Sequence, residues 1–334
     1  VEFKKKEVLE FKQNNNSKDT QVQSNVILLL NKINDQIIKY KVSNSESLIA
    51  LMELSSDISP ITKKLLNKFG IKYEDVACKI YEKLNNVKVL KSLQEINNLT
   101  IDLIIICVPM LQYQSIFKKL SNINLDKTIV TDVGSTKVNI EKLYNQKKYK
   151  FNFIPSHPIA GIEKAGLEHG FDGLFTNRYN IICPLKKSSK TNINKIVRFW
   201  KSLNMKIEIM SAKEHDKVLS LTSHLPHLIS YSLVLTAMKK ESSLNSKLVK
   251  FSAGGFRDFT RVAGSDPEMW RDIFLANNSQ IQKLTNNFIS ELKKFSKTLN
   301  QGNSKNLLTK LKKTKNVRDR IVKARQAGKF IPND

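Results

Sequence analysis

The chain has 334 residues, of which 40% are hydrophobic and 26% charged, which is enough for a buried core and, by length, for two domains. Its 3 cysteines, Cys78, Cys107 and Cys183, are far apart and lack C-x-x-C spacing, so they suggest neither a disulfide framework nor a thiolate metal site and favour a cytoplasmic location. Neither a nucleic-acid partner nor a membrane segment is expected, because the net charge of +26 comes from dispersed lysines and apolar runs such as 103–110 are too short to span a bilayer.

The first hundred residues contain no glycine before Gly70, so the glycine-rich turn that opens a dinucleotide-binding domain is missing there. The candidate opening strand, residues 25–30, runs into bulky side chains that would hold a pyrophosphate away from the backbone. Helices are predicted over 59–70 and 73–86. We therefore expect residues 1–85 to be a divergent first half of a nucleotide-binding domain.

A strand, helix and strand alternation follows. Residues 100–109 form an apolar run of strand length, 110–125 has a helical pattern, and 127–137 and 151–158 are two further strands that end in polar loops. This order is typical of an open, mainly parallel, Rossmann-like α/β sheet. Ligands of such sheets bind beyond the carboxyl ends of the strands, where Pro109, Ser135 and His157 would emerge.

From Ser211 onward the apolar residues recur at helical spacing, after a strand at 178–185 and a helix-like stretch at 193–210. We predict a Rossmann-like domain over 1–210 and an all-α domain over 211–334. The apolar stripes of the second domain exceed what one slim bundle can bury, so we expect a homodimer.

All 5 histidines fall between His157 and His227, which raises the question of a metal site. His224 and His227 form an H-x-x-H pair, but Pro226 interrupts the helical spacing and no H-E-x-x-H motif is present. No metal is predicted. Capping or packing roles are expected instead for His215 and His169.

His157 lies at the end of a strand, between an apolar run and Pro158. An imidazole is mostly neutral at pH 7, so one ring nitrogen can accept a hydrogen bond from a substrate hydroxyl. A histidine that merely caps the loop is the alternative. Ser135 is interpreted as a hydrogen-bonding neighbour of His157, since its sequence is not the G-x-S-x-G elbow of a nucleophile.

The segment 252–274 carries two arginines that are four residues apart, Arg257 and Arg261. Two guanidinium groups on one helix face suit a dicarboxylate, because each can bind a carboxylate bidentately. A surface ladder of salt bridges is the alternative. A further helix is predicted to begin at Ser265 or Asp266, with Pro267 in its first turn.

Four ordered motifs carry a family resemblance: "TDVGSTK", "SHPIAGIEKAG", "SHLPHLISYSLV" and "GGFRDFTRVAGSDPEMWRDIFLANN". Together they resemble the prephenate dehydrogenase family, including its cyclohexadienyl members, over about residues 86–328. The resemblance implies NAD- or NADP-dependent oxidative decarboxylation of prephenate or arogenate in tyrosine biosynthesis. A cofactor-deficient, substrate-binding remnant of the family and another β-hydroxyacid dehydrogenase are the alternatives.

By position in these motifs, the resemblance implies that His157 accepts the proton of the ring hydroxyl. Ser135 would orient both His157 and this hydroxyl. Arg261 would hold a substrate carboxylate. The implied substrate-binding residues are Arg261, His227, Arg257, Glu163 and Trp270, and the implied cofactor-binding residues are Val108, Pro109, Asp132 and Gly134. His224 would support the site.

Overall fold

The structure is a computed structural model that describes residues 48–52, 90, 92–161, 173–241 and 250–323. The chain divides into two compact units, and nearly all of the described residues belong to the second, which spans 49–52, 101–163 and 175–334. The predicted strand at 25–30 and the predicted helices at 59–70 and 73–86 lie outside the described residues. In the first unit, the short 3-10 helix η1 (Leu93–Asn98) begins at Ser92.

A four-stranded sheet forms the centre of the α/β part of the chain, with strand order β1-β2-β3-β4. Its strands are β1 (Leu48–Met52), β2 (Leu103–Cys107), β3 (Ile129–Asp132) and β4 (Asn152–Ile154). The pairs β2–β3 and β3–β4 are parallel, as predicted. Ile104, Ile106 and Val130 are fully buried, which explains why these strands are continuous apolar runs.

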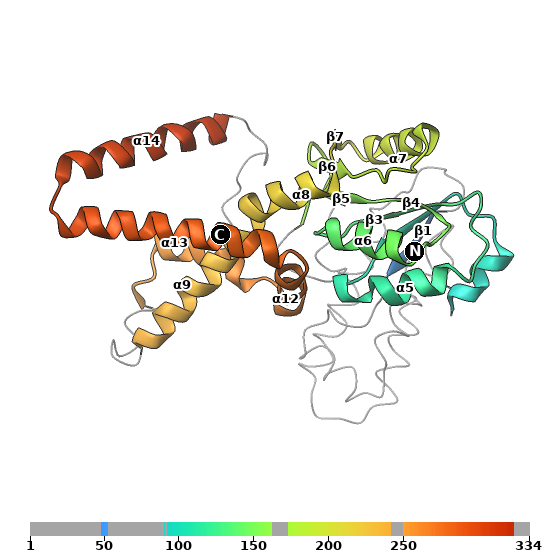
Figure 1. The fold of residues 1–334 in the computed structure, drawn as a ribbon, viewed down its shortest axis with the longest axis horizontal. Helices are drawn as coiled ribbons and strands as arrows, with labels where there is room; N and C mark the ends of the chain where they lie inside the picture. The colour runs from blue at the N-terminus through green and yellow to red at the C-terminus, as the bar shows by residue number, and fades with distance from the viewer. Residues whose placement is uncertain (1–47, 53–89, 91, 162–172, 242–249, 324–334) are drawn as a thin grey trace, which may run out of the picture. The chain divides into compact units, whose positions relative to one another are not determined.

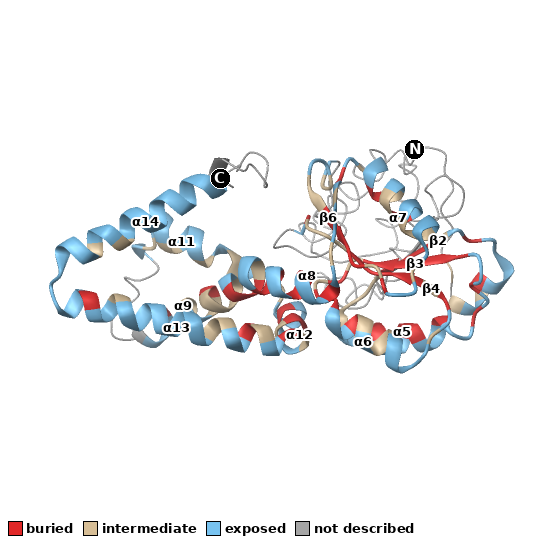
Figure 2. Cartoon of the chain, turned by 45° about the horizontal axis from the view of Figure 1, so that its top comes forward, coloured by how far each residue is buried: buried red, intermediate tan, exposed pale blue. Residues whose placement is uncertain are grey.

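Helices cover this sheet on both faces. One face is covered by η2 (Met110–Gln112), α5 (Tyr113–Leu120) and α6 (Val138–Gln146). The opposite face is covered by α7 (Lys190–Ser202) (Figures 1 and 2). The buried residues of α5 recur at i, i+3, i+4 and i+7, which is the spacing of a core-facing helix stripe. Phe117, at the centre of this stripe, meets Tyr144, Phe151 and Phe153 edge-on, so the helices are fixed to the sheet by aromatic packing.

A second, three-stranded sheet follows, with order β5-β6-β7. Its strands are β5 (Ser156–Pro158), β6 (Tyr179–Ile182) and β7 (Lys206–Ile209). The helical interpretation of 193–210 was therefore wrong in its second half. The helix ends before Asn204, which adopts a positive φ of 60°, and the following residues form a strand parallel to β6.

The described chain after Ser211 is almost wholly helical, as predicted. Its elements are α8 (Ala212–Leu219), the π-helical turn η4 (Ser220–His224), α9 (Leu225–Glu241), α11 (Gly254–Thr260), the 3-10 turn η5 (Arg261–Gly264), α12 (Pro267–Ala276), α13 (Asn278–Asn300) and α14 (Ser304–Lys323). Asp266 caps α12 by accepting from Met269 N at 2.7 Å, with Pro267 in the first turn, as expected.

One helical stretch of the described residues, Ala212–Lys239, is long and apolar enough to cross a membrane on length and composition alone. This is weak support for a span, since helices inside folded domains pass the same test. His215, Asp216 and His224 on this stretch are buried and hydrogen-bonded within the protein.

The helices α13 and α14 leave many apolar side chains exposed, as the pale blue ribbons of Figure 2 indicate. The large hydrophobic residues among them are Phe288, Ile289, Leu292, Leu299, Leu308, Leu311, Val317 and Ile321. So much exposed apolar surface on neighbouring helices is typical of an interaction surface.

Candidate active site

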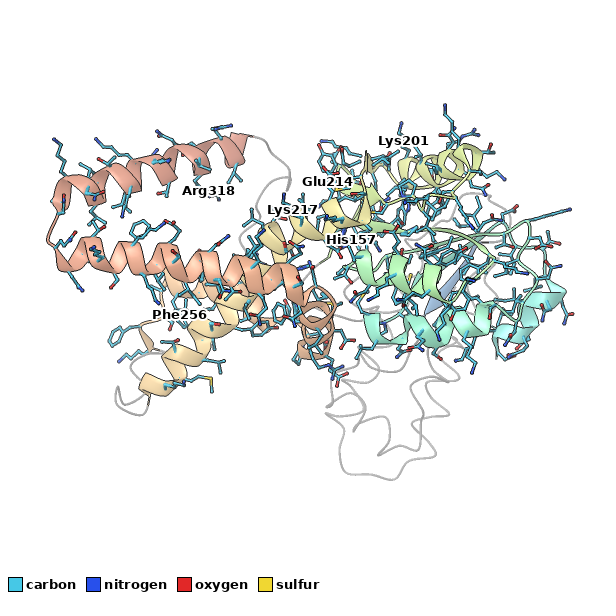
Figure 3. All side chains as sticks on the ribbon, in the orientation of Figure 1. His157, Lys201, Glu214, Lys217, Phe256 and Arg318 are labelled. Carbon is cyan, nitrogen blue, oxygen red and sulfur yellow. The ribbon has the colours of Figure 1, made fainter. Side chains whose placement is uncertain are left out.

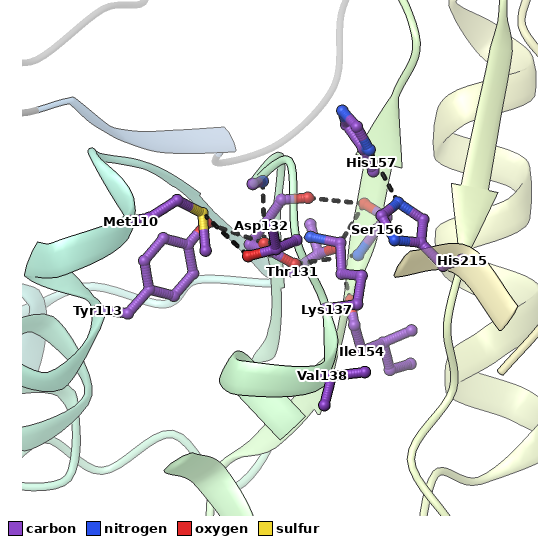
Figure 4. Close-up of polar contacts among 12 residues, drawn as sticks. Met110, Tyr113, Thr131, Asp132, Lys137, Val138, Ile154, Ser156, His157 and His215 are labelled. Atoms are coloured by element: carbon purple, nitrogen blue, oxygen red, sulfur yellow. Dashed lines mark hydrogen bonds and ion pairs between the residues drawn. The ribbon is translucent and has the colours of Figure 1, made fainter. Parts of the chain in front are cut away.

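His157 is the central residue of β5, which begins just beyond the carboxyl end of β4 in the parallel sheet (Figures 3 and 4). The preceding residue, Ser156, is fully buried, and its N–H donates to Asp132 Oδ1 at 3.0 Å. Its hydroxyl donates to the Asp132 carbonyl at 2.8 Å, and Trp200 Nε1 donates to that hydroxyl at 3.1 Å. The strand that carries His157 is thus fastened to the end of β3.

The imidazole of His157 belongs to a hydrogen-bonded row of three side chains. His157 Nδ1 lies 2.8 Å from His215 Nε2, and His215 Nδ1 lies 2.7 Å from Asp216 Oδ1. The Asp216 carboxylate also accepts the backbone N–H groups of Lys137 at 2.8 Å and Val138 at 2.9 Å, at the start of α6. The sequence interpretation, which gave His215 a capping or packing role, missed this connection.

The environment of His157 favours its neutral form. Burial lowers the pKa of His157 well below its ordinary value of 6.5, and the positive charges that His215, Lys137 and His224 can carry act in the same direction. Burial also lowers the pKa of His215, although its hydrogen bond to Asp216 opposes that shift. Both imidazoles are therefore uncharged at neutral pH.

Asp132 and Gly134 brace this edge of the sheet from within. Asp132 Oδ2 lies 2.5 Å from Lys137 Nζ, with both side chains fully buried, and it also accepts from the Tyr113 hydroxyl and from Gly134 N. A Cβ at Gly134 would lie only 2.6 Å from the Tyr113 hydroxyl. The Asp132 carboxylate and the Gly134 N–H are committed to internal partners, which favours a bracing role over the predicted contact with a cofactor.

The loops that follow β2 and β3 lie at the edge of the sheet where ligands of open α/β sheets bind. Val108 and Pro109 directly follow β2 and are partly exposed, and Ser135 is partly exposed after β3. Because β2 and β3 are parallel, both loops leave the sheet at the same edge. Residues 1–85, where a glycine-rich turn would be expected, lie outside the described residues apart from 48–52.

A small pocket opens beside this edge, with a volume of about 210 Å³. It is lined by Met110, Leu111, Tyr113, Asn139, Ile140, Leu143, Leu275 and Ala276. Its lining is mainly apolar, and its volume is below that of pockets that enclose whole drug-sized ligands. It can therefore accommodate only a part of a cofactor or substrate.

Two of the predicted substrate-binding residues, His227 and Trp270, are brought into direct contact. Their rings are stacked, with centroids 3.6 Å apart and an angle of 20° between the planes. His227 comes from α9 and Trp270 from α12, and the two residues are 43 positions apart in the sequence. Burial lowers the pKa of His227, so this stack presents a neutral imidazole.

His224 connects this stack to the His157 row, which agrees with the supporting role expected for it. Its ring meets Trp270 edge-on, and His224 Nδ1 lies 3.2 Å from the Asn277 amide nitrogen. The same amide donates to the Asp216 carbonyl at 2.9 Å. Burial lowers the pKa of His224 to about 4, so it too is neutral.

The two arginines lie between the two helices of the stack, after α9 and before α12. Arg257, on α11, is 77% exposed and 3.9 Å from Asp258, as in the surface-pair alternative. Arg261, at the start of η5, is also exposed. This segment is tied to α9, since Ser230 Oγ donates to the Phe259 carbonyl. The convergence of the arginines with His157 on one substrate stays a prediction.

Ser135 and Glu163 are the remaining predicted site residues. In the described part of the chain Ser135 makes no hydrogen bond to His157, whose Nδ1 meets His215 instead, and the orienting role of Ser135 stays a prediction. Glu163 lies outside the described residues. A histidine directly followed by an aspartate, just after the capped start of a helix at Ser211, is the sequence signal that could have identified His215.

The parallel sheet with a neutral histidine at its carboxyl edge, followed by a helical domain, defines a two-domain protein of the nucleotide-binding dehydrogenase class. Residues 69–209 match the nucleotide-binding domain of prephenate dehydrogenase, and residues 211–313 match its dimerization domain. The chain belongs to the prephenate dehydrogenase family.

Curated relatives and a solved structure agree with this membership. The cyclohexadienyl dehydrogenase of Zymomonas mobilis is 34% identical over 65% of this chain and 74% of the relative, and the prephenate dehydrogenase of Bacillus subtilis is 34% identical over 67% of this chain and 61% of the relative. A prephenate dehydrogenase from A. aeolicus, solved with hydroxyphenyl propionate and NAD+, has a TM-score of 0.69 and 29% identity, covering 87% of this chain and 94% of its own. The mainly parallel Rossmann-like fold with a helical dimerization domain is thereby confirmed.

Proposed function

We propose that this chain is an NAD- or NADP-dependent prephenate or arogenate dehydrogenase of tyrosine biosynthesis. The observation that carries the proposal is a neutral His157 at the carboxyl edge of the sheet, in a chain of this family. The curated relatives are named cyclohexadienyl and prephenate dehydrogenases, and the similar solved enzyme holds NAD+. The curated relatives come from bacteria, which supports the cytoplasmic location that we propose.

In the proposed reaction His157 acts as the base for the substrate. In the described part of the chain nothing hydrogen-bonds its Nε2, so this nitrogen is free to accept the proton of the ring hydroxyl. When bound, NAD or NADP would accept the hydride from the ring carbon that bears this hydroxyl. Val108, Pro109 and Ser135 would hold the cofactor at the edge where β2 and β3 end.

The helical part of the chain would bind the rest of the substrate. The stacked pair of His227 and Trp270 offers a flat face and a neutral imidazole, which suit a six-membered ring with polar substituents. Arg261 would bind a carboxylate, Arg257 would add positive charge, and Glu163 would complete the pocket. We place the boundary between the two domains after residue 210, and Ser211 caps the first helix of the second.

We also propose that the chain forms a homodimer. The match to a dimerization domain and the exposed apolar side chains of α13 and α14 both support this.

The function is tested by following nucleotide reduction with prephenate and with arogenate, each combined with NAD+ and NADP+. Titration calorimetry with both nucleotides accompanies the assay. Reduction with at least one substrate and binding of at least one nucleotide are expected. An absence of binding at millimolar nucleotide would support the cofactor-deficient remnant instead.

Replacing Arg261 by alanine should raise KM for the substrate more than it changes kcat. A guanidinium that holds a remote carboxylate contributes equally to the ground state and the transition state. Steady-state kinetics with varied substrate measure this, and Arg318→Ala on α14 is the matched control, for which no change is expected. A purely kcat effect of Arg261→Ala would remove Arg261 from the carboxylate site.

The acid limb of kcat/KM should lie below pH 6.5. The active form of His157 is neutral, and burial together with His215, Lys137 and His224 lowers its pKa well below 6.5. Activity should therefore stay level from neutral pH down to 6.5 and fall only as pH drops through the lowered pKa. A pH profile of kcat/KM checks this, and an acid limb centred at or above 6.5 would contradict it.

A further inference from the structure

The hydrogen bonds that join His157, His215 and Asp216 run in one direction, and that direction decides which nitrogen of His157 is free. Figure 4 shows the contact between His157 and His215. We infer that His215 and Asp216 are positioning residues that fix the tautomer of His157, with the proton on Nδ1 and a bare Nε2. The inference deepens the proposed function and rests on it only for its catalytic meaning.

The direction begins at Asp216, which is nearly fully buried. Its carboxylate faces only donors, because Lys137 N and Val138 N are backbone N–H groups that cannot accept a hydrogen bond. An ionised carboxylate is an acceptor at both oxygens. The third group that it meets, His215 Nδ1, must therefore donate to it at 2.7 Å.

The proton on His215 Nδ1 determines the rest of the row. A neutral imidazole carries one proton, so Nε2 of His215 is an acceptor. His157 Nδ1, 2.8 Å away, must then donate to it, which leaves His157 Nε2 without a proton. The opposite tautomer of His157 would place two bare nitrogens against each other and lose the hydrogen bond between them.

This arrangement suits a base that accepts one proton in each catalytic cycle. The substrate O–H bond breaks, and its proton forms a new N–H bond at His157 Nε2, so no proton has to leave Nδ1 first. The imidazolium that forms keeps its hydrogen bond to His215, and the Asp216 carboxylate lies at the far end of the row. The start of α6 holds that carboxylate in place through two backbone N–H groups.

The tautomer is read directly by long-range 1H–15N correlation spectroscopy of the whole chain labelled with 15N-histidine, without substrate or cofactor. The chain has only 5 histidines, and the spectrum of His157→Asn identifies the His157 signals. We expect His157 with a protonated Nδ1 and a bare Nε2, and His215 also protonated at Nδ1. A His157 that carries its proton on Nε2 would overturn the inference, whether or not the chain is an active dehydrogenase.

Kinetics of three variants distinguish positioning from packing. His215→Leu should lower kcat by about 10- to 100-fold with little change in KM, as is common when the partner of a functional histidine is lost. His215→Gln should recover most of this loss, because the amide oxygen can accept from His157 and the amide N–H can donate to Asp216. Equal losses in both variants would mean that His215 only fills space.

Glu214→Gln is the matched control, since it neutralises an exposed carboxylate on the same helix two residues before Asp216. It should leave both kcat and the histidine spectrum unchanged. If His215→Leu does not fold, the spectrum of the unmodified protein still decides the tautomer. If the unmodified protein reduces no nucleotide, the proposed function fails while the spectrum continues to test the positioning of His157.

Discussion

Replacing His157 by asparagine should lower kcat by about 10²- to 10⁴-fold and leave KM for the substrate nearly unchanged. The side-chain amide of asparagine can still form hydrogen bonds, but it cannot take up a proton at neutral pH. The lost interaction is therefore one that strengthens only as the substrate hydroxyl loses its proton. His157 is well placed for such a role, because its Nδ1 is engaged by His215 and its pKa is lowered by burial.

Steady-state kinetics of His157→Asn measure the effect, with urea unfolding as the check that the fold is intact. Lys217→Asn, at an exposed position of α8, is the control and should retain full activity. A loss confined to KM, or a loss of less than about tenfold in kcat, would mean that another group takes the proton.

Replacing Asp132 by alanine should destabilise the protein by about 3–5 kcal/mol, the largest effect on stability that we expect. Asp132 and Lys137 are both fully buried, so the change leaves an ammonium group with no opposite charge and no water. It also removes the acceptor of the Tyr113 hydroxyl, of Gly134 N and of Ser156 N. The strand that carries His157 would lose one of its hydrogen bonds to β3, while the bond from the Ser156 hydroxyl to the main-chain carbonyl of residue 132 remains.

The unfolding midpoint in urea measures this loss. The double variant Asp132→Ala, Lys137→Met should be more stable than Asp132→Ala alone, because it no longer buries an unpaired charge. Asp319→Ala removes an exposed partner of Lys315 on α14 and should leave the midpoint unchanged. A single variant as stable as the unmodified protein would show that Lys137 finds solvent or another anion.

The parallel strands and the helical second half could be predicted from the sequence because each depends on local pattern. The apolar run at 103–107 is buried on both faces, and the helical spacing after Ser211 persists through α13. The position of His157 at the carboxyl edge follows from the same pattern, since it comes directly after a strand of the sheet.

The partners of His157 could not be predicted in this way. His215 is 58 residues further along the chain, and the packing of α8 against α6 and β6 brings its ring to His157. The internal role of Asp132 likewise depends on Lys137, Tyr113 and Ser156 arriving from three different elements. Strand β7 was not predicted because its alternation of polar and apolar side chains covers only four residues and follows a long helix.

The claim that this chain is a working prephenate or arogenate dehydrogenase is tested most directly by counting products. Carbon dioxide and reduced nucleotide should form in equal amounts from the preferred substrate, and both should be lost together in His157→Asn. Reduced nucleotide without carbon dioxide would assign the chain to another β-hydroxyacid reaction. The absence of both products with each substrate and each nucleotide would contradict the account.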